Sequence, residues 1–188
     1  MNSHRRGLAY ANCTITARKL CAICILTIYL FCGIIYIEKQ KGFDTMMKII
    51  NFDMDGTLAN FYGVEGWLDD LENSRSRPYR VAKPLVNMSA LARVLNRLQR
   101  EGWTINIISW LSKTGTPEFD KEVTTVKQKW LTKHLPSVQF DNIYIVPYGT
   151  PKHNISDGIL FDDEKPNRDN WNGQAFDVDN ILGILKAL

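Results

Sequence analysis

The chain contains, at residues 48–57, the segment Lys48-Ile49-Ile50-Asn51-Phe52-Asp53-Met54-Asp55-Gly56-Thr57. Its first half is mostly apolar, which is typical of a short buried strand, and its second half is polar. Because side chains alternate along an extended segment, Asp53 and Asp55 are expected on the same side of the chain. Gly56 lets the backbone turn sharply directly after them. The segment therefore predicts a strand that delivers two carboxylates to one edge of a sheet.

The sequence after Met47 alternates between short apolar runs and amphipathic stretches. We predict strands over 48–53, 104–109, 142–146, 158–161 and 174–178, and helices over 87–100, 117–134 and 180–188. Short apolar strands that alternate with helices are typical of a parallel sheet covered on both faces. The predicted fold class is therefore α/β, with a five-stranded parallel sheet.

Polar residues lie at or near the carboxyl ends of four predicted strands, which is where open parallel sheets bind ligands. Besides Asp53 and Asp55, these residues are Ser109, Lys152 and Asp162. One carboxylate can attack phosphorus, and a second one nearby can protonate the leaving oxygen and later activate water. Asp53 is the expected nucleophile of such a reaction, and Asp55 is the expected acid and base.

The same edge of the sheet is suited to Mg²⁺, which prefers oxygen ligands. We expect the side chains of Asp53 and Asp162 as ligands, with a main-chain carbonyl near Asp55 as the third. Lys152 and Ser109 are expected to contact the phosphoryl oxygens, where negative charge spreads in the transition state. Lys113 and Lys165 are alternatives to Lys152.

These residues resemble the motifs of the haloacid dehalogenase (HAD) superfamily. The first motif, DxDx[T/V], matches Asp53, Asp55 and Thr57, and the second, a Ser or Thr that closes an apolar strand, matches Ser109. The third, a lysine, matches Lys152, and the fourth, an acidic pair after a strand, matches Asp162-Asp163. The resemblance covers about residues 47–188 and is carried by four motifs in the right order.

The resemblance implies a HAD-like Rossmannoid three-layer sandwich with a very small helical cap. It implies a Mg²⁺-dependent phosphatase that works through an aspartyl-phosphate, since dehalogenases of this superfamily lack the second aspartate of the first motif. Thr57, Ser109 and Lys152 would then bind phosphate. Asp163 would orient metal-bound water behind the direct ligand Asp162.

The segment after the fourth motif narrows the resemblance. Asp162-Asp163-Glu164-Lys165-Pro166-Asn167, followed by Trp171-Asn172-Gly173, is similar to the 5′(3′)-deoxyribonucleotidase branch. The leading hypothesis is therefore a phosphomonoesterase for a small phosphorylated substrate such as a nucleoside monophosphate. The alternatives are a phosphatase for phosphoproteins or polynucleotide ends, and a non-catalytic phosphate-binding or membrane-tethered scaffold. Intact Asp53, Asp55 and Asp162 argue against the scaffold.

The cap insert is expected at about residues 58–86. It contains four aromatic residues and three arginines: Phe61, Tyr62, Trp67 and Tyr79, with Arg75, Arg77 and Arg80. One interpretation is a lid that stacks on a base and meets a phosphate. The other is that the aromatic residues pack a short helix and the arginines are solvated. Nothing in the sequence indicates the oligomeric state, although a neighbouring subunit could complete so short a cap.

The chain has 188 residues and a formal net charge of +3, and the excess positive charge lies in residues 1–46. Residues 47–188 have a slight negative balance, so we expect no binding to duplex nucleic acid. All four cysteines lie in residues 1–46, and Cys21 and Cys24 are best interpreted as buried small hydrophobic residues. No disulfide framework is therefore expected in the body.

Residues 20–37 form a run without a formal charge that is long enough for a membrane-spanning helix. Two interpretations remain open for this N-terminal extension, residues 1–46. It is either a single-pass membrane anchor, or translation starts at Met46 or Met47 and the protein is cytoplasmic. In both cases residues 47–188 are the expected hydrolase domain.

Overall fold

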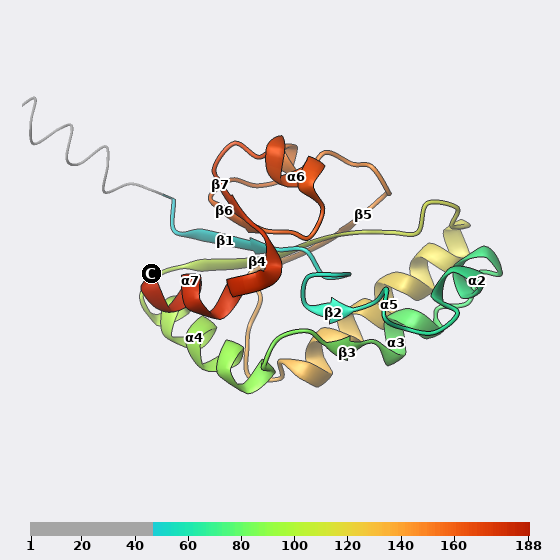
Figure 1. Ribbon diagram of the computed structural model, residues 1–188, viewed down its shortest axis with the longest axis horizontal. Helices are drawn as coiled ribbons and strands as arrows, with labels where there is room; N and C mark the ends of the chain where they lie inside the picture. The colour runs from blue at the N-terminus through green and yellow to red at the C-terminus, as the bar shows by residue number, and fades with distance from the viewer. Residues whose placement is uncertain (1–46) are drawn as a thin grey trace, which may run out of the picture. The chain divides into compact units, whose positions relative to one another are not determined.

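A five-stranded parallel sheet forms the centre of residues 47–188, the part of the chain that this computed structural model describes (Figure 1). The strand order is β5-β4-β1-β6-β7. The strands are β1 (Ile49–Phe52), β4 (Thr104–Trp110), β5 (Asn142–Val146), β6 (Ile159–Phe161) and β7 (Gln174–Phe176). The predicted α/β class with five parallel strands is confirmed, and the predicted strand ends differ from these by no more than two residues.

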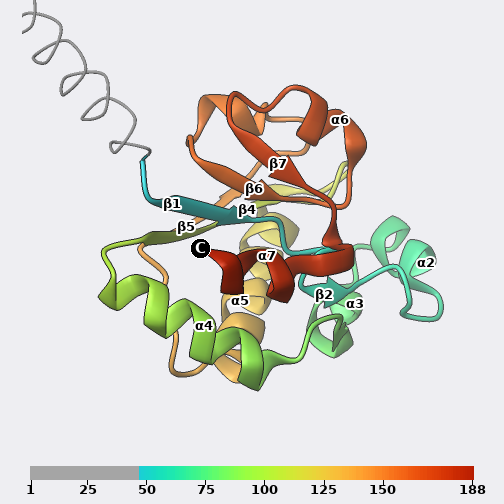
Figure 2. The same cartoon turned by 60° about the vertical axis from the view of Figure 1, so that its left-hand side comes forward.

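Helices cover both faces of the sheet. Helices α4 (Met88–Arg100), α5 (Pro117–His134) and α7 (Ile181–Ala187) lie on one face, and α6 (Lys165–Asp169) lies on the other (Figures 1 and 2). The chain runs outward from β1 to β4 and β5, and then returns past β1 to β6 and β7. Because such crossovers are right-handed, the reversal of direction moves the later connections to the opposite face.

The predicted helix boundaries coincide with local caps. Asn87 precedes α4, and its side-chain oxygen accepts a hydrogen bond of 3.0 Å from the backbone N–H of Ala90. Thr116 does the same for α5 by accepting from Phe119 N at 3.2 Å, and Pro117 occupies the first turn. Such side chains satisfy backbone donors that a helix start leaves unpaired.

Alternation along the strands divides the core between the two faces. Ile107 and Phe161 belong to the larger core together with residues of α4 and α7, whereas their neighbours Ile108 and Leu160 pack with Trp171 on the other face. The second face carries less apolar cover, since α6 is short and β5 is joined to β6 by a loop with one 3₁₀ turn, η1 (Lys152–Asn154).

A ladder of asparagines connects the loop between β5 and β6 to the face of the sheet that α6 covers. Asn51, Asn106 and Asn142 stand in register on β1, β4 and β5. Asn142 donates to Asn106 and Asn106 donates to Asn51, each at 3.0 Å. The side-chain amide of Asn51 then donates to the carbonyl of Asp157 at 2.7 Å. The ladder satisfies two buried amides and holds the chain as it enters β6.

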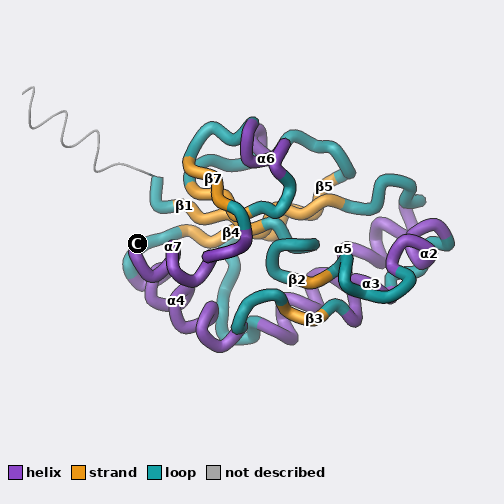
Figure 3. Tube along the Cα trace, in the orientation of Figure 1, coloured by secondary structure: helices purple, strands orange, loops and turns teal. Residues whose placement is uncertain are grey.

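The cap is a small insert between β1 and α4. It consists of β2 (Ala59–Asn60), α2 (Trp67–Glu72), α3 (Arg77–Val81) and β3 (Lys83–Pro84), which lie beside α5 (Figure 3). Strands β2 and β3 pair antiparallel. Phe61 and Tyr79 of the cap pack against Phe119, Val123 and Val126 of α5 in a separate apolar cluster. The insert is therefore anchored to the body and forms a fixed wall beside the carboxyl end of the sheet.

Within residues 47–188, none of the helices combines the length and the apolar character needed to cross a membrane. The predicted span over 20–37 lies outside the described residues.

The asparagine ladder leads to a stability prediction. We expect Asn106→Ala to lower the free energy of unfolding by about 2–4 kcal/mol, because it strips the partner from a fully buried oxygen of Asn51. The matched control is Asn142→Ala, which removes one bond from an exposed residue and should cost less than about 1 kcal/mol. Urea denaturation followed by circular dichroism measures both, and equal losses would contradict the role given to the ladder.

Candidate active site

The site lies at the carboxyl ends of β1 and β6, where the strand order reverses. Sheets of this kind bind ligands in the crevice at that point. Asp53 directly follows β1 and Asp162 directly follows β6. Both backbones are still held by the sheet: Asp53 N donates to Phe161 O at 2.9 Å, and Asp162 N donates to Phe176 O at 3.2 Å. The two carboxylates are thus placed by the strands themselves.

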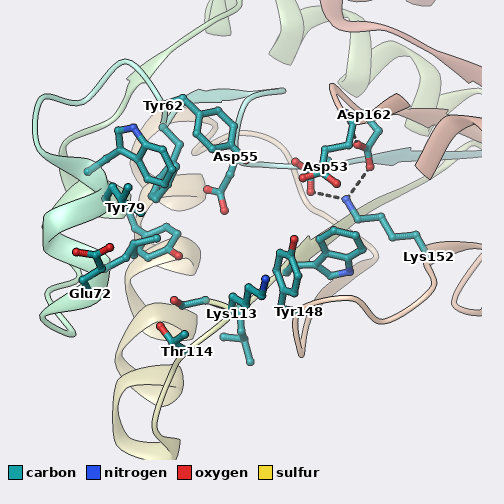
Figure 4. Close-up of a pocket in the computed structure, with 18 residues that line it drawn as sticks. Asp53, Asp55, Tyr62, Glu72, Tyr79, Lys113, Thr114, Tyr148, Lys152 and Asp162 are labelled. Atoms are coloured by element: carbon teal, nitrogen blue, oxygen red, sulfur yellow. Dashed lines mark hydrogen bonds and ion pairs between the residues drawn. The ribbon is translucent and has the colours of Figure 1, made fainter. Parts of the chain in front are cut away.

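Lys152 binds both of these carboxylates. Its Nζ donates to Asp53 Oδ1 and to Asp162 Oδ2, each at 2.6 Å (Figure 4). All three side chains are buried, with Asp162 completely inaccessible. Burial acts to lower the pKa of Lys152, but the charges of Asp53 and Asp162 outweigh burial and raise that pKa above its ordinary value. Lys152 is therefore a fixed cation at this edge of the sheet.

The structure distinguishes Lys152 from the two alternative lysines. Lys165 forms a surface pair with Asp169, and Lys113 lies at the pocket with its Nζ 5.8 Å from the centre of the Tyr148 ring. Neither lysine binds Asp53 or Asp162, so among the described residues Lys152 has the geometry expected for the third motif.

Asp163 is fastened to the loop after β1. Thr57 Oγ1 donates to Asp163 Oδ1 at 3.1 Å, and Asp163 N donates to Thr57 Oγ1 at 3.2 Å. Gly56 has φ +84°, and a Cβ at this position would overlap the Asp163 carboxylate. Thr57 is fully buried and does not line the pocket. Its hydroxyl links the first and fourth motifs, and its contact with phosphate stays a prediction.

Residues of α6 hold the acidic pair from the other side. The amide of Asn167 donates to both oxygens of Asp162, at 3.2 and 3.1 Å. The guanidinium of Arg168 donates to the carbonyls of Asp162 and Asp163, each at 2.7 Å. Asn167 and Arg168 belong to the segment that is similar to the deoxyribonucleotidase branch. In this structure they orient the acidic pair of the fourth motif.

A second buried lysine, Lys127 of α5, contacts the other aspartate of the first motif. Its Nζ donates to Asp55 Oδ2 at 2.5 Å, to Ser109 Oγ at 2.8 Å and to the carbonyl of Trp110 at 2.6 Å. The sequence analysis did not identify Lys127. A signal was present, since Lys127 falls in the helical spacing of the buried residues Val123 and Trp130 on the apolar face of α5.

The Ser109 hydroxyl is likewise bonded within the protein. Ser109 is fully buried near the end of β4 and does not line the cavity, and its hydroxyl accepts from Lys127. Its contact with phosphate stays a prediction. Ser109 helps to hold the ammonium group that binds Asp55.

Carboxylates outnumber cations in this cluster. The carboxylates of Asp53, Asp55 and Asp162 pair with the two ammonium groups of Lys152 and Lys127. A fourth carboxylate, that of Asp163, is bonded to Thr57 and pairs with neither lysine. Burial raises the pKa of Asp53 and of Asp162, and for Asp162 the charge of Asp53 raises it further. Burial, and then the charges of Asp53 and Asp162, raise the pKa of Asp163 to about 7.

The excess negative charge and the oxygen donors fit a divalent cation. Asp53 and Asp162 are the pair that would hold Mg²⁺, which suits carboxylate oxygens. No three acidic, histidine or cysteine side chains within residues 47–188 already converge as a metal-binding group. The reason is that Lys152 lies between Asp53 and Asp162, whereas the side chain of Asp55 turns to Lys127. A ligand from Asp55 would therefore come from its main chain.

A cavity of about 370 Å³ opens beside Asp53 and Asp55 (Figure 4). The cap supplies one aromatic wall that includes Tyr62, Trp67 and Tyr79, and the opposite side carries Trp110 and Tyr148, whose ring centres are 5.1 Å apart. The volume is in the range of small-molecule sites, and an aromatic lining favours a planar apolar group.

The cap arginines do not reach the cavity. Arg75 and Arg77 both pair with the buried Asp70, and Arg80 lies 3.7 Å from Glu122. The aromatic residues of the cap, in contrast, line the cavity. The arginines of the cap are used for its internal structure and for its contact with α5.

No protein-family model and no curated protein matches the chain. The solved structures that are similar to it include two phosphatases. A D,D-heptose 1,7-bisphosphate phosphatase from B. bronchiseptica, complexed with magnesium and phosphate, is 13% identical with a TM-score of 0.40, over 63% of this chain and 71% of that chain. The enzyme of the same name from Burkholderia thailandensis is 11% identical with a TM-score of 0.44, over 74% and 96%. Likenesses of this size leave the function to be inferred from the site.

The acidic cluster predicts how stability depends on pH and Mg²⁺. Because the pKa of Asp163 is raised to about 7, its contribution to stability is complete below the ordinary pKa of about 4 and is lost as the pH rises through about 7. A divalent cation offsets the repulsion that remains. We therefore expect Mg²⁺ to raise the Tm more at about pH 8 than at about pH 5.5.

Thermal unfolding with Mg²⁺ and with EDTA measures this difference. The variant Asp163→Asn should reduce the dependence of the Mg²⁺ effect on pH, because it removes one titrating carboxyl. An equal Tm shift at both pH values in the unaltered protein would contradict the prediction.

Proposed function

We propose that this protein is a Mg²⁺-dependent phosphomonoesterase that transfers a phosphoryl group first to Asp53 and then to water. The observation that carries the proposal is that Asp53 and Asp55 line one cavity while each is bound by its own buried lysine. Two carboxylates in different environments can take two different chemical roles. The resemblance of the four motifs to the HAD superfamily supports the same reaction.

In the first step, a carboxylate oxygen of Asp53 attacks phosphorus and the bond from phosphorus to the leaving oxygen breaks. Asp55 protonates that leaving oxygen. In the second step, water attacks the aspartyl-phosphate, Asp55 accepts the proton of this water, and Asp53 is released. Lys152 keeps Asp53 oriented and supplies positive charge beside the phosphoryl oxygens.

Mg²⁺ held by Asp53 and Asp162 would add charge that stabilises the phosphoryl oxygens. The protein's own contribution is to hold the two carboxylates close together, which Lys152 does by binding both at 2.6 Å. The charge of Lys152 also opposes the rise in their pKa that burial causes. Asn167 adds donors to the Asp162 oxygens and so supports its ionised form.

The preferred substrate that we propose is a nucleoside monophosphate. The aromatic walls of the cavity suit a planar base, and the volume of about 370 Å³ suits a small metabolite. Tyr62, Leu68 and Tyr148 are about half exposed around the cavity, so its entrance is open. This openness is the observation that favours the second candidate, a phosphatase for phosphoprotein or polynucleotide ends.

The nucleophile has a direct test. We expect Asp53→Asn to lower Mg²⁺-dependent phosphate release from an aryl phosphate by about 10³-fold or more, because an amide cannot attack phosphorus. The fold should persist, which circular dichroism checks. Phosphate release from this variant at the unaltered rate would contradict the proposed reaction.

The aromatic wall tests the substrate class. Tyr148 is half exposed and its ring lies tilted beside that of Trp110, so Tyr148→Leu should leave the fold intact. We expect its KM for a nucleoside monophosphate to rise by about 10-fold, since stacking on a base contributes about 1–3 kcal/mol. The KM for glycerol phosphate, which has no ring, serves as the control and should not change. Equal changes in both KM values would argue against a base in this cavity.

A further inference from the structure

Lys127 uses all three of its ammonium hydrogens inside the protein. The side chain is fully buried, and its acceptors are Asp55 Oδ2, Ser109 Oγ and the carbonyl of Trp110, at 2.5 to 2.8 Å. An ammonium group has three donors, so none is left for a substrate or for water. Three acceptors from two separate segments also fix where the nitrogen lies. Lys127 is therefore a fixed support for Asp55.

The contact makes the two oxygens of Asp55 unequal. Oδ2 accepts from Lys127, whereas Oδ1 is buried and has no hydrogen-bond partner within the described part of the chain. Asp55 itself lines the cavity (Figure 4). A buried acceptor without a partner is costly. A proton carried by Asp55 resides on Oδ1, because Oδ2 already faces a donor.

We propose that Lys127 is the positioning residue for proton transfer by Asp55. It holds Oδ2, and so fixes the orientation in which the Asp55 carboxyl group gives a proton to the leaving oxygen as the bond from phosphorus to that oxygen breaks. The same carboxyl group takes a proton from the attacking water as the bond from phosphorus to Asp53 breaks. Lys127 itself touches no reacting atom. This inference rests on the phosphomonoesterase function proposed above.

Lys127 also lies next to the cap. Its Nζ lies 4.9 Å from the centre of the Tyr79 ring. Tyr79 lines the cavity, and the centre of its ring lies 4.6 Å from that of Phe61. The cation is thus enclosed by α5, β4, the first-motif loop and the cap. This enclosure excludes water from the lysine, which keeps its contact with Asp55 strong.

The test compares two substrates that differ in their need for a proton. The leaving oxygen of 4-nitrophenyl phosphate departs without protonation, whereas the alkoxide of glycerol phosphate must be protonated. We expect Lys127→Met in the full chain to lower kcat for glycerol phosphate by about 10²-fold and kcat for 4-nitrophenyl phosphate by less than about 5-fold. The KM values should change by less than about 2-fold, since Lys127 does not touch the substrate.

Two further variants separate positioning from folding. Lys129→Met removes an exposed lysine from the same helix and should leave both rates unchanged. Lys127→Met combined with Asp55→Asn removes both partners of the buried pair, which proteins tolerate better than removing one. This double variant should be no slower on glycerol phosphate than Asp55→Asn alone, because residues that act as a unit are not additive. If Lys127→Met does not fold, Lys127→Gln, whose amide keeps two N–H donors, should show a smaller loss with the same dependence on the leaving group.

Equal losses on the two substrates would overturn the inference, and so would a double variant with the full product of the two single losses. Both outcomes leave the proposed function intact, provided that the unaltered protein releases phosphate and Asp53→Asn does not. Absence of phosphate release from both substrates by the unaltered protein would overturn the function and the inference together.

Discussion

The ammonium group of Lys152 joins the three segments that form the catalytic edge. It binds Asp53 after β1 and Asp162 after β6 from its own position in η1, which is otherwise a loop. Buried charges are stable only when each is paired, so loss of any one of the three would leave the others uncompensated. The parallel sheet brings Asp53 and Asp162 together, and the positive charge of Lys152 offsets the repulsion between their carboxylates.

A second lysine gives the neighbouring aspartate a different environment. Asp55 is only two residues from Asp53, yet it pairs with Lys127 of α5 and not with Lys152. Identical carboxyl groups acquire different roles through such differences in partners and burial. In the proposed reaction the nucleophile, Asp53, lies at the edge of the sheet, whereas the acid and base, Asp55, lies where the sheet, α5 and the cap meet.

The body and the cap contribute different parts of the cavity. Its polar end is formed by the body, and its aromatic wall is formed by the cap, whose apolar cluster with α5 holds that wall in place. The cap arginines serve the cap itself through Asp70. In the proposed function, the group attached to phosphate is therefore recognised mainly by this aromatic wall, which suits a ring.

The sequence by itself determined the strands, the long helices and the placement of Asp53, Asp55 and Asp162. These features are local, because hydrophobic periodicity defines the strands and parallel strands bring their carboxyl ends to one edge. The asparagine ladder, the engagement of Thr57 with Asp163 and the role of Lys127 were decided only by the tertiary structure. Lys127 is 72 residues from Asp55 in the chain. Which lysine of α5 becomes buried against that aspartate depends on how the helix is rotated and packed, and a motif of adjacent residues carries no information about that.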